Sequence, residues 1–168
     1  MSAQSSSTNE ASPSFASLSV GDELTPLERG PMTPVHVMRW SAAIENWHRI
    51  HYDAPFAVEH DALPALLVNG SWKQHFVVQM LRQWLGQDGW LARVSFQFRA
   101  MDPVGSTLTA HGTITDLSER AGFGWVECEI GIRNTEGQES TPGTALGVLP
   151  LNGGESVPYP FPVGLLDD

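Results

Sequence analysis

The 168-residue sequence predicts an α+β domain in which an antiparallel sheet wraps around one long helix. Two observations support this class. Apolar side chains cover more than one face of the helix expected over residues 71–85, and a helix of this kind is usually buried by a sheet. After Trp90 the apolar residues recur with the period of strands, and three or four strands follow one another along the chain.

Composition limits the classes of function. A hydrophobic content of 41% is enough to fill the core of one domain. The formal net charge of -10 argues against a nucleic-acid-binding or membrane-binding surface, because both need basic stripes. The single cysteine, Cys128, allows no intrachain disulfide, and no apolar run approaches the roughly 20 residues that span a bilayer. We therefore expect a soluble, cytoplasmic protein.

Three segments are expected along the chain. Residues 1–14 are polar and Ser-rich, which predicts a disordered tail because there is little apolar surface to bury. Residues 15–151 form the domain. Residues 152–168 are rich in Gly, Pro and acidic residues and are expected to trail over the surface as a C-terminal tail, with apolar residues such as Phe161 available to hold it down.

The first helix is predicted from Pro34 to about Glu45. Thr33 supplies an N-cap hydroxyl, and proline is well tolerated at the first helical position. Pro55 then disfavours helical angles at Ala54, so a turn follows, with a further helical turn at 56–60.

The long helix is predicted to begin with a capping box formed by Ser71 and Gln74 and to end at Gly86 and Gly89. The strands after it are predicted from the alternation of apolar and polar residues. They span residues 94–100, 108–114, 126–132 and 144–149, with turns at 102–105, 120–122 and 134–137.

A cluster of proton-transfer groups lies between the two helices. Asn46 to Asp53 reads N-W-H-R-I-H-Y-D and holds two imidazoles, a carboxylate, a phenol and an amide. Soon afterwards Gly70 opens the apolar helix. A helix start offers unpaired N–H groups that can hold an oxygen as it becomes anionic, and an imidazole exchanges protons near neutral pH. The combination predicts acid/base chemistry beside an oxyanion site.

This run, followed by Phe56-Ala57 and an apolar stretch ending in Asn69-Gly70, resembles the MaoC-like hydratase/dehydratase family of the hot-dog fold. The closer similarity is to the branch of mesaconyl-CoA-type hydratases and mitochondrial 3-hydroxyacyl-thioester dehydratases. The resemblance covers roughly Val20 to Pro150. It implies a hot-dog sheet around a long helix, paired into a homodimer or a heterodimer of hot-dog subunits. It also implies hydration of enoyl-CoA thioesters, or dehydration of 3-hydroxyacyl-CoA thioesters.

The resemblance also implies roles for particular residues. His51 falls on the catalytic histidine, and Gly70 falls on the glycine whose N–H binds the thioester oxygen. Asn46 stands where the broader family has its catalytic aspartate, and His48 stands where it has asparagine. Because an amide cannot take a proton, Asn46 can orient water, which leaves His48 or Asp53 as candidates for the second acid/base.

Several neighbours are expected to line the substrate pocket. They are Asn69, Ser71, Arg49, Tyr52 and Trp72, and Asn69 stands where the family commonly has histidine. Structural alternatives remain open for four residues: a buried histidine bonded to a carbonyl for His51, a supporting or surface residue for His48, a turn former for Asp53, and a packing residue for Tyr52. No compact His, Cys and carboxylate set is present, so we expect neither a metal nor another cofactor.

Two rival functions are considered. A hot-dog thioesterase often carries a carboxylate on its central helix, whereas residues 71–85 contain no Asp or Glu. A non-catalytic or partner-dependent hot-dog subunit is favoured by the loss of the family aspartate at Asn46 and disfavoured by His51 and Gly70. Acyl-CoA is the preferred thioester substrate over acyl carrier protein, because carrier proteins are acidic like this chain.

Overall fold

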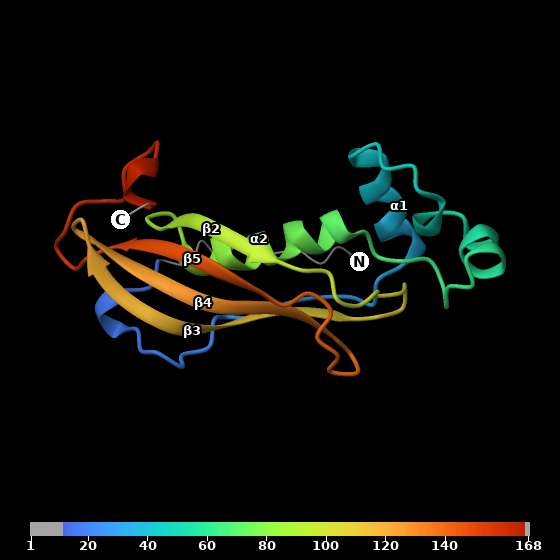
Figure 1. Ribbon diagram of the computed structural model, residues 1–168, viewed down its shortest axis with the longest axis horizontal. Helices are drawn as coiled ribbons and strands as arrows, with labels where there is room; N and C mark the ends of the chain where they lie inside the picture. The colour runs from blue at the N-terminus through green and yellow to red at the C-terminus, as the bar shows by residue number, and fades with distance from the viewer. Residues whose placement is uncertain (1–11, 167–168) are drawn as a thin grey trace, which may run out of the picture.

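The computed structural model describes residues 12–166, so most of the expected N-terminal tail, residues 1–14, lies outside the described residues. A five-stranded antiparallel sheet curls around one long helix (Figure 1). The helix is α2 (Gly70–Leu85), and the sheet has the order β1-β3-β4-β5-β2. Its strands are β1 (Leu27–Arg29), β2 (Trp90–Phe96), β3 (Leu108–Arg120), β4 (Phe123–Asn134) and β5 (Gly143–Pro150). The predicted α+β class, with a sheet wrapped around a helix, is confirmed.

The strands differ from the prediction at their ends. The first strand after α2 runs over 90–96 and not over 94–100, because the chain leaves the regular ladder after Phe96. There the N–H groups of Gln97 and Arg99 donate to the carbonyls of Pro142 and Ser140. The short edge strand β1 was not predicted. Three residues offer too little alternation to indicate a strand, and β1 is defined by its pairing with β3.

The longest pair of strands, β3 and β4, is joined at the predicted turn. Ala121 (φ 50°) and Gly122 (φ 81°) both adopt left-handed angles, which suit a tight hairpin between twisted strands. A bulge between Ile114 and Asp116 shifts the register of the pair. It increases the local bend, which helps the sheet to curl over the helix.

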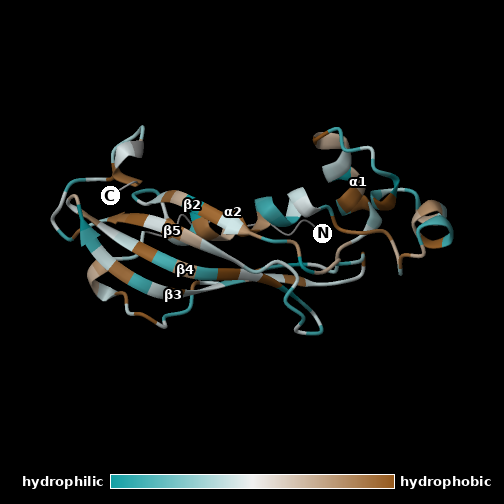
Figure 2. Ribbon diagram, viewed as in Figure 1, coloured by the Kyte–Doolittle hydropathy of each residue, from teal (hydrophilic) through white to brown (hydrophobic). Residues whose placement is uncertain are grey.

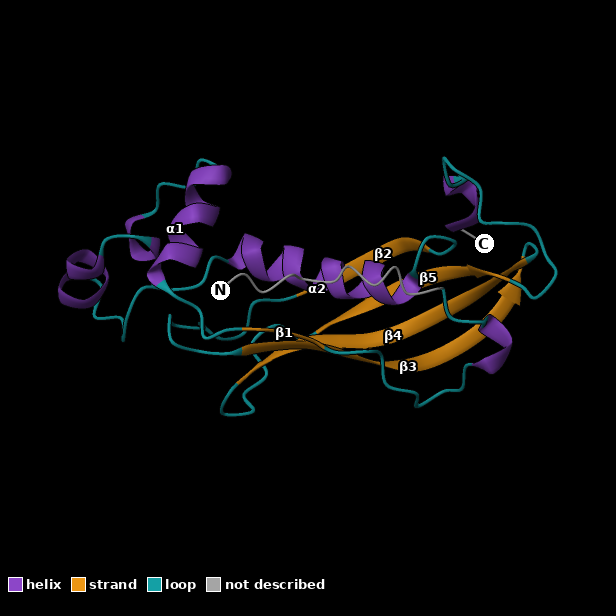
Figure 3. Ribbon diagram, turned by 180° about the vertical axis from the view of Figure 1, so that it is seen from behind, coloured by secondary structure: helices purple, strands orange, loops and turns teal. Residues whose placement is uncertain are grey.

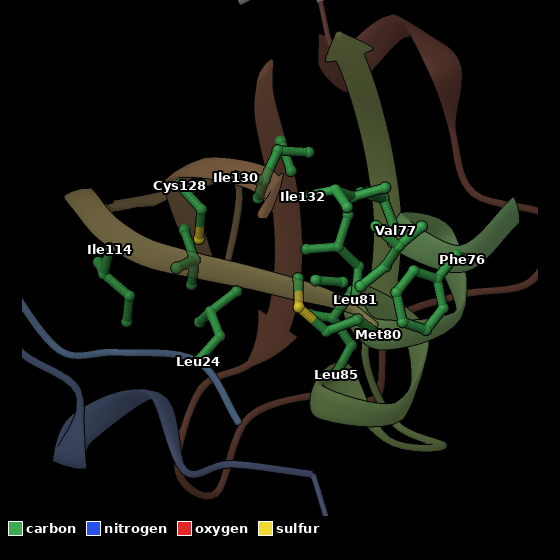
Figure 4. Packing of buried hydrophobic residues seen from close by; sticks show 14 of the residues in the cluster. Leu24, Phe76, Val77, Met80, Leu81, Leu85, Ile114, Cys128, Ile130 and Ile132 are labelled. Atoms are coloured by element: carbon green, nitrogen blue, oxygen red, sulfur yellow. The ribbon is translucent and has the colours of Figure 1, made fainter. Parts of the chain in front are cut away.

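The core lies between α2 and the concave face of the sheet. Figure 4 shows side chains of α2 pointing at side chains of β3 and β4. The helix contributes Phe76, Val77, Met80, Leu81 and Leu85, and the other side contributes Leu24, Ile114, Cys128, Ile130 and Ile132. The burial expected for this helix is confirmed. Its C-terminus is also as predicted, because Gly86 (φ 69°) follows the last helical residue.

The C-terminal segment crosses the opposite, convex face of the sheet. Phe161 is 6% exposed and its ring stacks 6.1 Å from that of Trp90. It also meets Trp125 edge-on at 5.9 Å. This aromatic cluster holds part of the segment against the sheet.

A lobe formed by residues 33–68 extends beyond the sheet at the end where α2 begins (Figures 1 and 3). It contains α1 (Pro34–Ala43), which starts as predicted. Thr33 Oγ1 accepts from the N–H of His36, and His36 Nδ1 accepts from the N–H of Thr33. The helix ends at Ala43, ahead of Glu45, whose φ of 54° is not helical. The predicted turn at 56–60 is a single π-helical turn, Phe56–His60.

None of the helices between residues 12 and 166 combines the length and the apolar character needed to cross a bilayer.

Candidate active site

The N-terminus of α2 has no side-chain cap. Asn69 occupies the N-cap position, but its amide Nδ2 donates to Ser41 Oγ at 3.0 Å and makes no capping bond. The N–H groups of Trp72 and Lys73 both donate to the Asn69 carbonyl. Within residues 12–166, the N–H groups of Gly70 and Ser71 have no acceptor. Two backbone donors at the positive end of the helix dipole are therefore open to an anionic oxygen.

The predicted capping box at Ser71 and Gln74 is wrong. The helix begins at Gly70, so Ser71 is already its second residue and cannot cap it. The Ser71 hydroxyl instead accepts from the indole N–H of Trp40 at 2.9 Å. Together with the Ser41–Asn69 bond, this contact ties α1 to the first turn of α2. Neither contact is predictable from a sequence pattern, because both join residues about thirty positions apart.

His51 is bound to Leu67, in the segment that leads into this helix. It ends the short 3-10 helix Arg49–His51, is 7% exposed, and places its Nδ1 2.9 Å from the carbonyl oxygen of Leu67. The N–H of Leu67 in turn donates to the carbonyl of Ile50. Because a carbonyl only accepts, Nδ1 must carry the proton, and Nε2 of the neutral ring keeps its lone pair.

The surroundings of His51 favour the neutral ring. Burial lowers its pKa below the ordinary histidine value, and the nearby His48 lowers it further, whereas the Leu67 carbonyl acts in the opposite direction. At neutral pH the imidazole is therefore uncharged, with Nε2 able to accept a proton.

The exposed His48 lies next to His51, and the half-buried Asn46 is bound to the backbone of His48. The rings of His48 and His51 are 6.0 Å apart and tilted by 56°. Asn46 Oδ1 accepts from the backbone N–H of His48 at 3.2 Å, and the N–H of Asn46 donates to the Ser41 carbonyl. Asn46 thus shapes the turn that presents His48 beside His51.

Asp53, Arg49 and Tyr52 make contacts within the lobe. Asp53 Oδ2 lies 2.7 Å from Arg49 Nη2, and Asp53 Oδ1 accepts from the N–H of Phe56 at 3.1 Å. The hydrogen bonds from Arg49 and from Phe56 lower the pKa of the Asp53 carboxyl. Tyr52 donates its hydroxyl proton to the Trp47 carbonyl at 2.8 Å. These contacts match the turn-forming and packing alternatives for Asp53 and Tyr52.

Trp72 turns toward the core, where its ring stacks 4.8 Å from that of Phe76. A different aromatic residue lies over the helix start. A Cβ added at Gly70 would be 3.0 Å from the ring of Phe98, which is 51% exposed. Phe98, placed in a strand by its alternation, lies beyond the end of β2, and the sequence pattern did not connect it with the site.

A buried ion pair also holds the first turn of this helix. Lys73 Nζ donates to Asp102 Oδ2 at 2.9 Å and to the Ala100 carbonyl at 3.0 Å. The sequence carried one signal for it, because Lys73 is the only lysine of the chain and lies in an apolar helix. Among residues 12–166 no three His, Cys, Asp or Glu side chains come close enough to hold a metal ion.

The antiparallel sheet curled around one long helix defines a hot-dog fold. The structure superposes on an (R)-hydratase from A. caviae involved in PHA biosynthesis, with a TM-score of 0.70 and 24% identity over 80% of this chain and 98% of that chain. It also matches R-hydratase PhaJ1 from Pseudomonas aeruginosa, with a TM-score of 0.73 and 14% identity over 83% of this chain and 86% of that chain. At these identities the likeness establishes the fold.

The family follows from the sequence. The family model for hydroxyacyl-thioester dehydratase type 2 matches residues 3–106, which is more than half of the chain, and the chain belongs to that family. A search of curated protein sequences finds no match. A further structural neighbour is a chain of the ChsH1-ChsH2 complex from Mycobacterium tuberculosis, with a TM-score of 0.66 and 18% identity over 78% of this chain and 98% of that chain.

Proposed function

We propose that the protein is a hydro-lyase that interconverts enoyl-CoA and 3-hydroxyacyl-CoA thioesters, with His51 as the acid/base and Gly70 as the oxyanion donor. One observation carries the proposal. The His51 ring is fixed by the carbonyl of Leu67, just before the uncapped start of α2, and its Nε2 is free to accept a proton. Because Leu67 shortly precedes Gly70 in the chain, this contact supports the proposal that a proton acceptor and an anion-binding helix end serve one site.

The reaction follows from these two groups. In hydration, Nε2 of His51 takes a proton from water as the water oxygen attacks the β carbon. Negative charge moves to the thioester oxygen, where the N–H of Gly70 binds it. The proton held at Nε2 then passes to the α carbon, and the double bond becomes a hydroxyl-bearing single bond. Dehydration runs through the same steps in reverse.

The second polar group of the reaction is assigned to His48, with Asn46 in support. The amide of Asn46 can accept from and donate to water but cannot take its proton. The His48 ring is exposed and lies next to His51, so it can bind the attacking water or relay its proton. Asp53 is not given this role, because Arg49 and the N–H of Phe56 occupy its carboxylate.

We further propose that a second hot-dog subunit covers the lobe. Figure 2 shows apolar residues on α1 and the adjoining turns at this end of the molecule. Five large apolar side chains are exposed in this lobe, and their number within one short segment of the chain favours an interaction surface there. They are Val35 (63%), Met38 (43%), Ile44 (42%), Trp47 (57%) and Val58 (46%).

The finer assignments rest on the sequence. The run from Asn46 to Asp53 is the basis for placing the chain near mesaconyl-CoA-type hydratases within its family. The net charge of -10 favours a CoA thioester over an acidic carrier protein.

The second candidate function is that of a partner-dependent subunit. Two observations favour it: Asn46 cannot act as a base, and one structural neighbour belongs to a complex of two different chains, ChsH1 and ChsH2. In that case the partner would supply the missing acid/base.

Loss of enoyl absorbance tests the proposal directly. The purified protein is assayed with short, branched, dicarboxylic and steroid-side-chain enoyl-CoA thioesters, and its mass in solution is measured by light scattering after size exclusion. Turnover by a homodimer supports the hydro-lyase. An inactive homodimer that gains activity only with a second hot-dog protein supports the subunit, and hydrolysis of the thioester without hydration points to a thioesterase.

A further inference from the structure

The N-cap residue of α2 has the right chemistry and the right backbone for capping, yet it does not cap. Asparagine is among the best N-cap residues, and Asn69 has the extended backbone of a cap (φ -63°, ψ 135°). Its side chain is nevertheless bound to Ser41 Oγ, and its Oδ1 is buried without a partner. An oxygen that would ordinarily accept from the first turn of the helix is thus left unused in the interior.

Ser41 is well placed to hold the amide in this state. Both Ser41 and Asn69 are fully buried, so water does not compete for their hydrogen bond. Ser41 lies on α1, and the neighbouring Trp40 binds Ser71 of α2, which fixes the distance between the two helices. The amide therefore cannot turn toward the helix without breaking a buried bond.

We infer that Ser41 is a positioning residue that holds the Asn69 side chain away from the start of α2, so that the N–H groups of Gly70 and Ser71 stay open to the thioester oxygen. The inference rests on the proposed function of Gly70. If Ser41 released the amide, Asn69 Oδ1 would accept from the N–H of Ser71, as an N-cap does. The amide would then compete with the substrate for the same end of the helix.

The release of the Asn69 amide is tested with Ser41→Ala, which removes the hydroxyl that accepts from Asn69 Nδ2 and adds no bulk. Measurements are made on the full chain, in the oligomer it forms, with enoyl-CoA as substrate. In S41A the amide exchange of Ser71 slows and kcat/KM falls by about fivefold, the population ratio that a typical N-cap preference supports. Replacing Asn69 by alanine in the same protein, S41A/N69A, restores fast exchange at Ser71 and returns most of the lost activity. N69A alone is measured as the reference for the double variant.

Recovery of activity in S41A/N69A distinguishes a positioning role of Ser41 from a general loss of packing. If S41A only disturbed packing, a second truncation beside it would lower activity further, and that result overturns the inference. Unchanged exchange at Ser71 in S41A overturns it as well. An exchange effect without any change in kcat/KM also overturns it, while leaving the role of His51 intact. If the unaltered protein and its oligomer hydrate none of the thioesters, the proposed function itself has failed.

Discussion

Lys73 and Asp102 form an ion pair with 2.9 Å between Nζ and Oδ2, and only 3% and 0% of their side chains are exposed. The pair joins the first turns of α2 to the segment that follows β2. The N–H of Val68 also donates to the Asp102 carbonyl, so Asp102 is bound to the helix and to the chain that precedes it. The start of α2 is thereby fixed from the sheet side.

Removal of one partner from this pair should destabilise the fold strongly. We expect Lys73→Met to lower the free energy of unfolding by about 3–5 kcal/mol, because it leaves a buried carboxylate without its cation. Urea unfolding measures the change, with the exposed Arg82→Met on the same helix as control. The double variant K73M/D102L should be more stable than K73M. If K73M alone unfolds like the control, the pair contributes nothing to stability.

His51→Gln should lower kcat by roughly 10²–10⁴, the usual contribution of a general acid/base. The bond to the Leu67 carbonyl would also be expected of a purely structural histidine, so activity and stability must be measured together. Stability should change by only about 1 kcal/mol, the value of one hydrogen bond. His60→Gln, an exposed imidazole bound to Asp61, is the matched control. Full turnover by H51Q would leave His51 a structural role only.

The lowered pKa of His51 also predicts a pH dependence of stability. The unfolded chain takes up this proton near the ordinary value of about 6.5, and the folded protein takes it up only at lower pH. The contribution of His51 is therefore fully present above pH 6.5 or so and is lost as the pH falls through the folded pKa. Unfolding measured across this range should show a steeper acid-side loss for the unaltered protein than for H51Q. Parallel curves would mean that the pKa of His51 is not lowered.

The same shift sets the acid limb of activity. If neutral His51 is the base in hydration, kcat/KM should fall only below the pH at which an ordinary histidine titrates. A pH profile with short enoyl-CoA measures the position of this limb. An acid limb above pH 7 would point to a different group.

Gly70→Ala should fold but lose activity. Its Cβ would come within 3.0–3.1 Å of the Phe98 ring, and because that ring is 51% exposed it can move aside. The methyl group and the displaced ring would then crowd the open N–H groups, so we expect a fall in kcat/KM of at least about tenfold, toward the loss of an oxyanion donor. The double variant G70A/F98A should recover part of the lost kcat/KM. Undiminished turnover by G70A would show that the thioester oxygen binds elsewhere.

Asp53→Asn tests whether the carboxylate is the second acid/base. The amide keeps an oxygen for the N–H of Phe56 and removes the proton acceptor. We expect turnover to stay within about threefold of the unaltered protein, because the pair with Arg49 is a partly exposed contact of the lobe. A loss comparable to that of H51Q would instead assign Asp53 to the reaction.

The sequence by itself determined the class of fold, and it is the basis for the proposal of where the chemistry takes place. The period change after Trp90, the apolar helix and the turn at residues 120–122 depend on neighbours in the chain, and each is found in the structure. The run from Asn46 to Asp53 and the glycine that opens α2 are also recognisable from neighbouring residues in the chain.

Only the tertiary structure decided which side chains meet at the helix end. Asn69 is bound by Ser41, Ser71 by Trp40, and Lys73 by Asp102, each across about thirty residues. Such contacts leave no period or motif in the sequence, because they depend on how α1 and the segment after β2 pack against α2. The predicted capping box at Ser71 is wrong because α2 begins one residue earlier, at Gly70, and the residue at the N-cap position, Asn69, is bound to Ser41 instead of capping the helix.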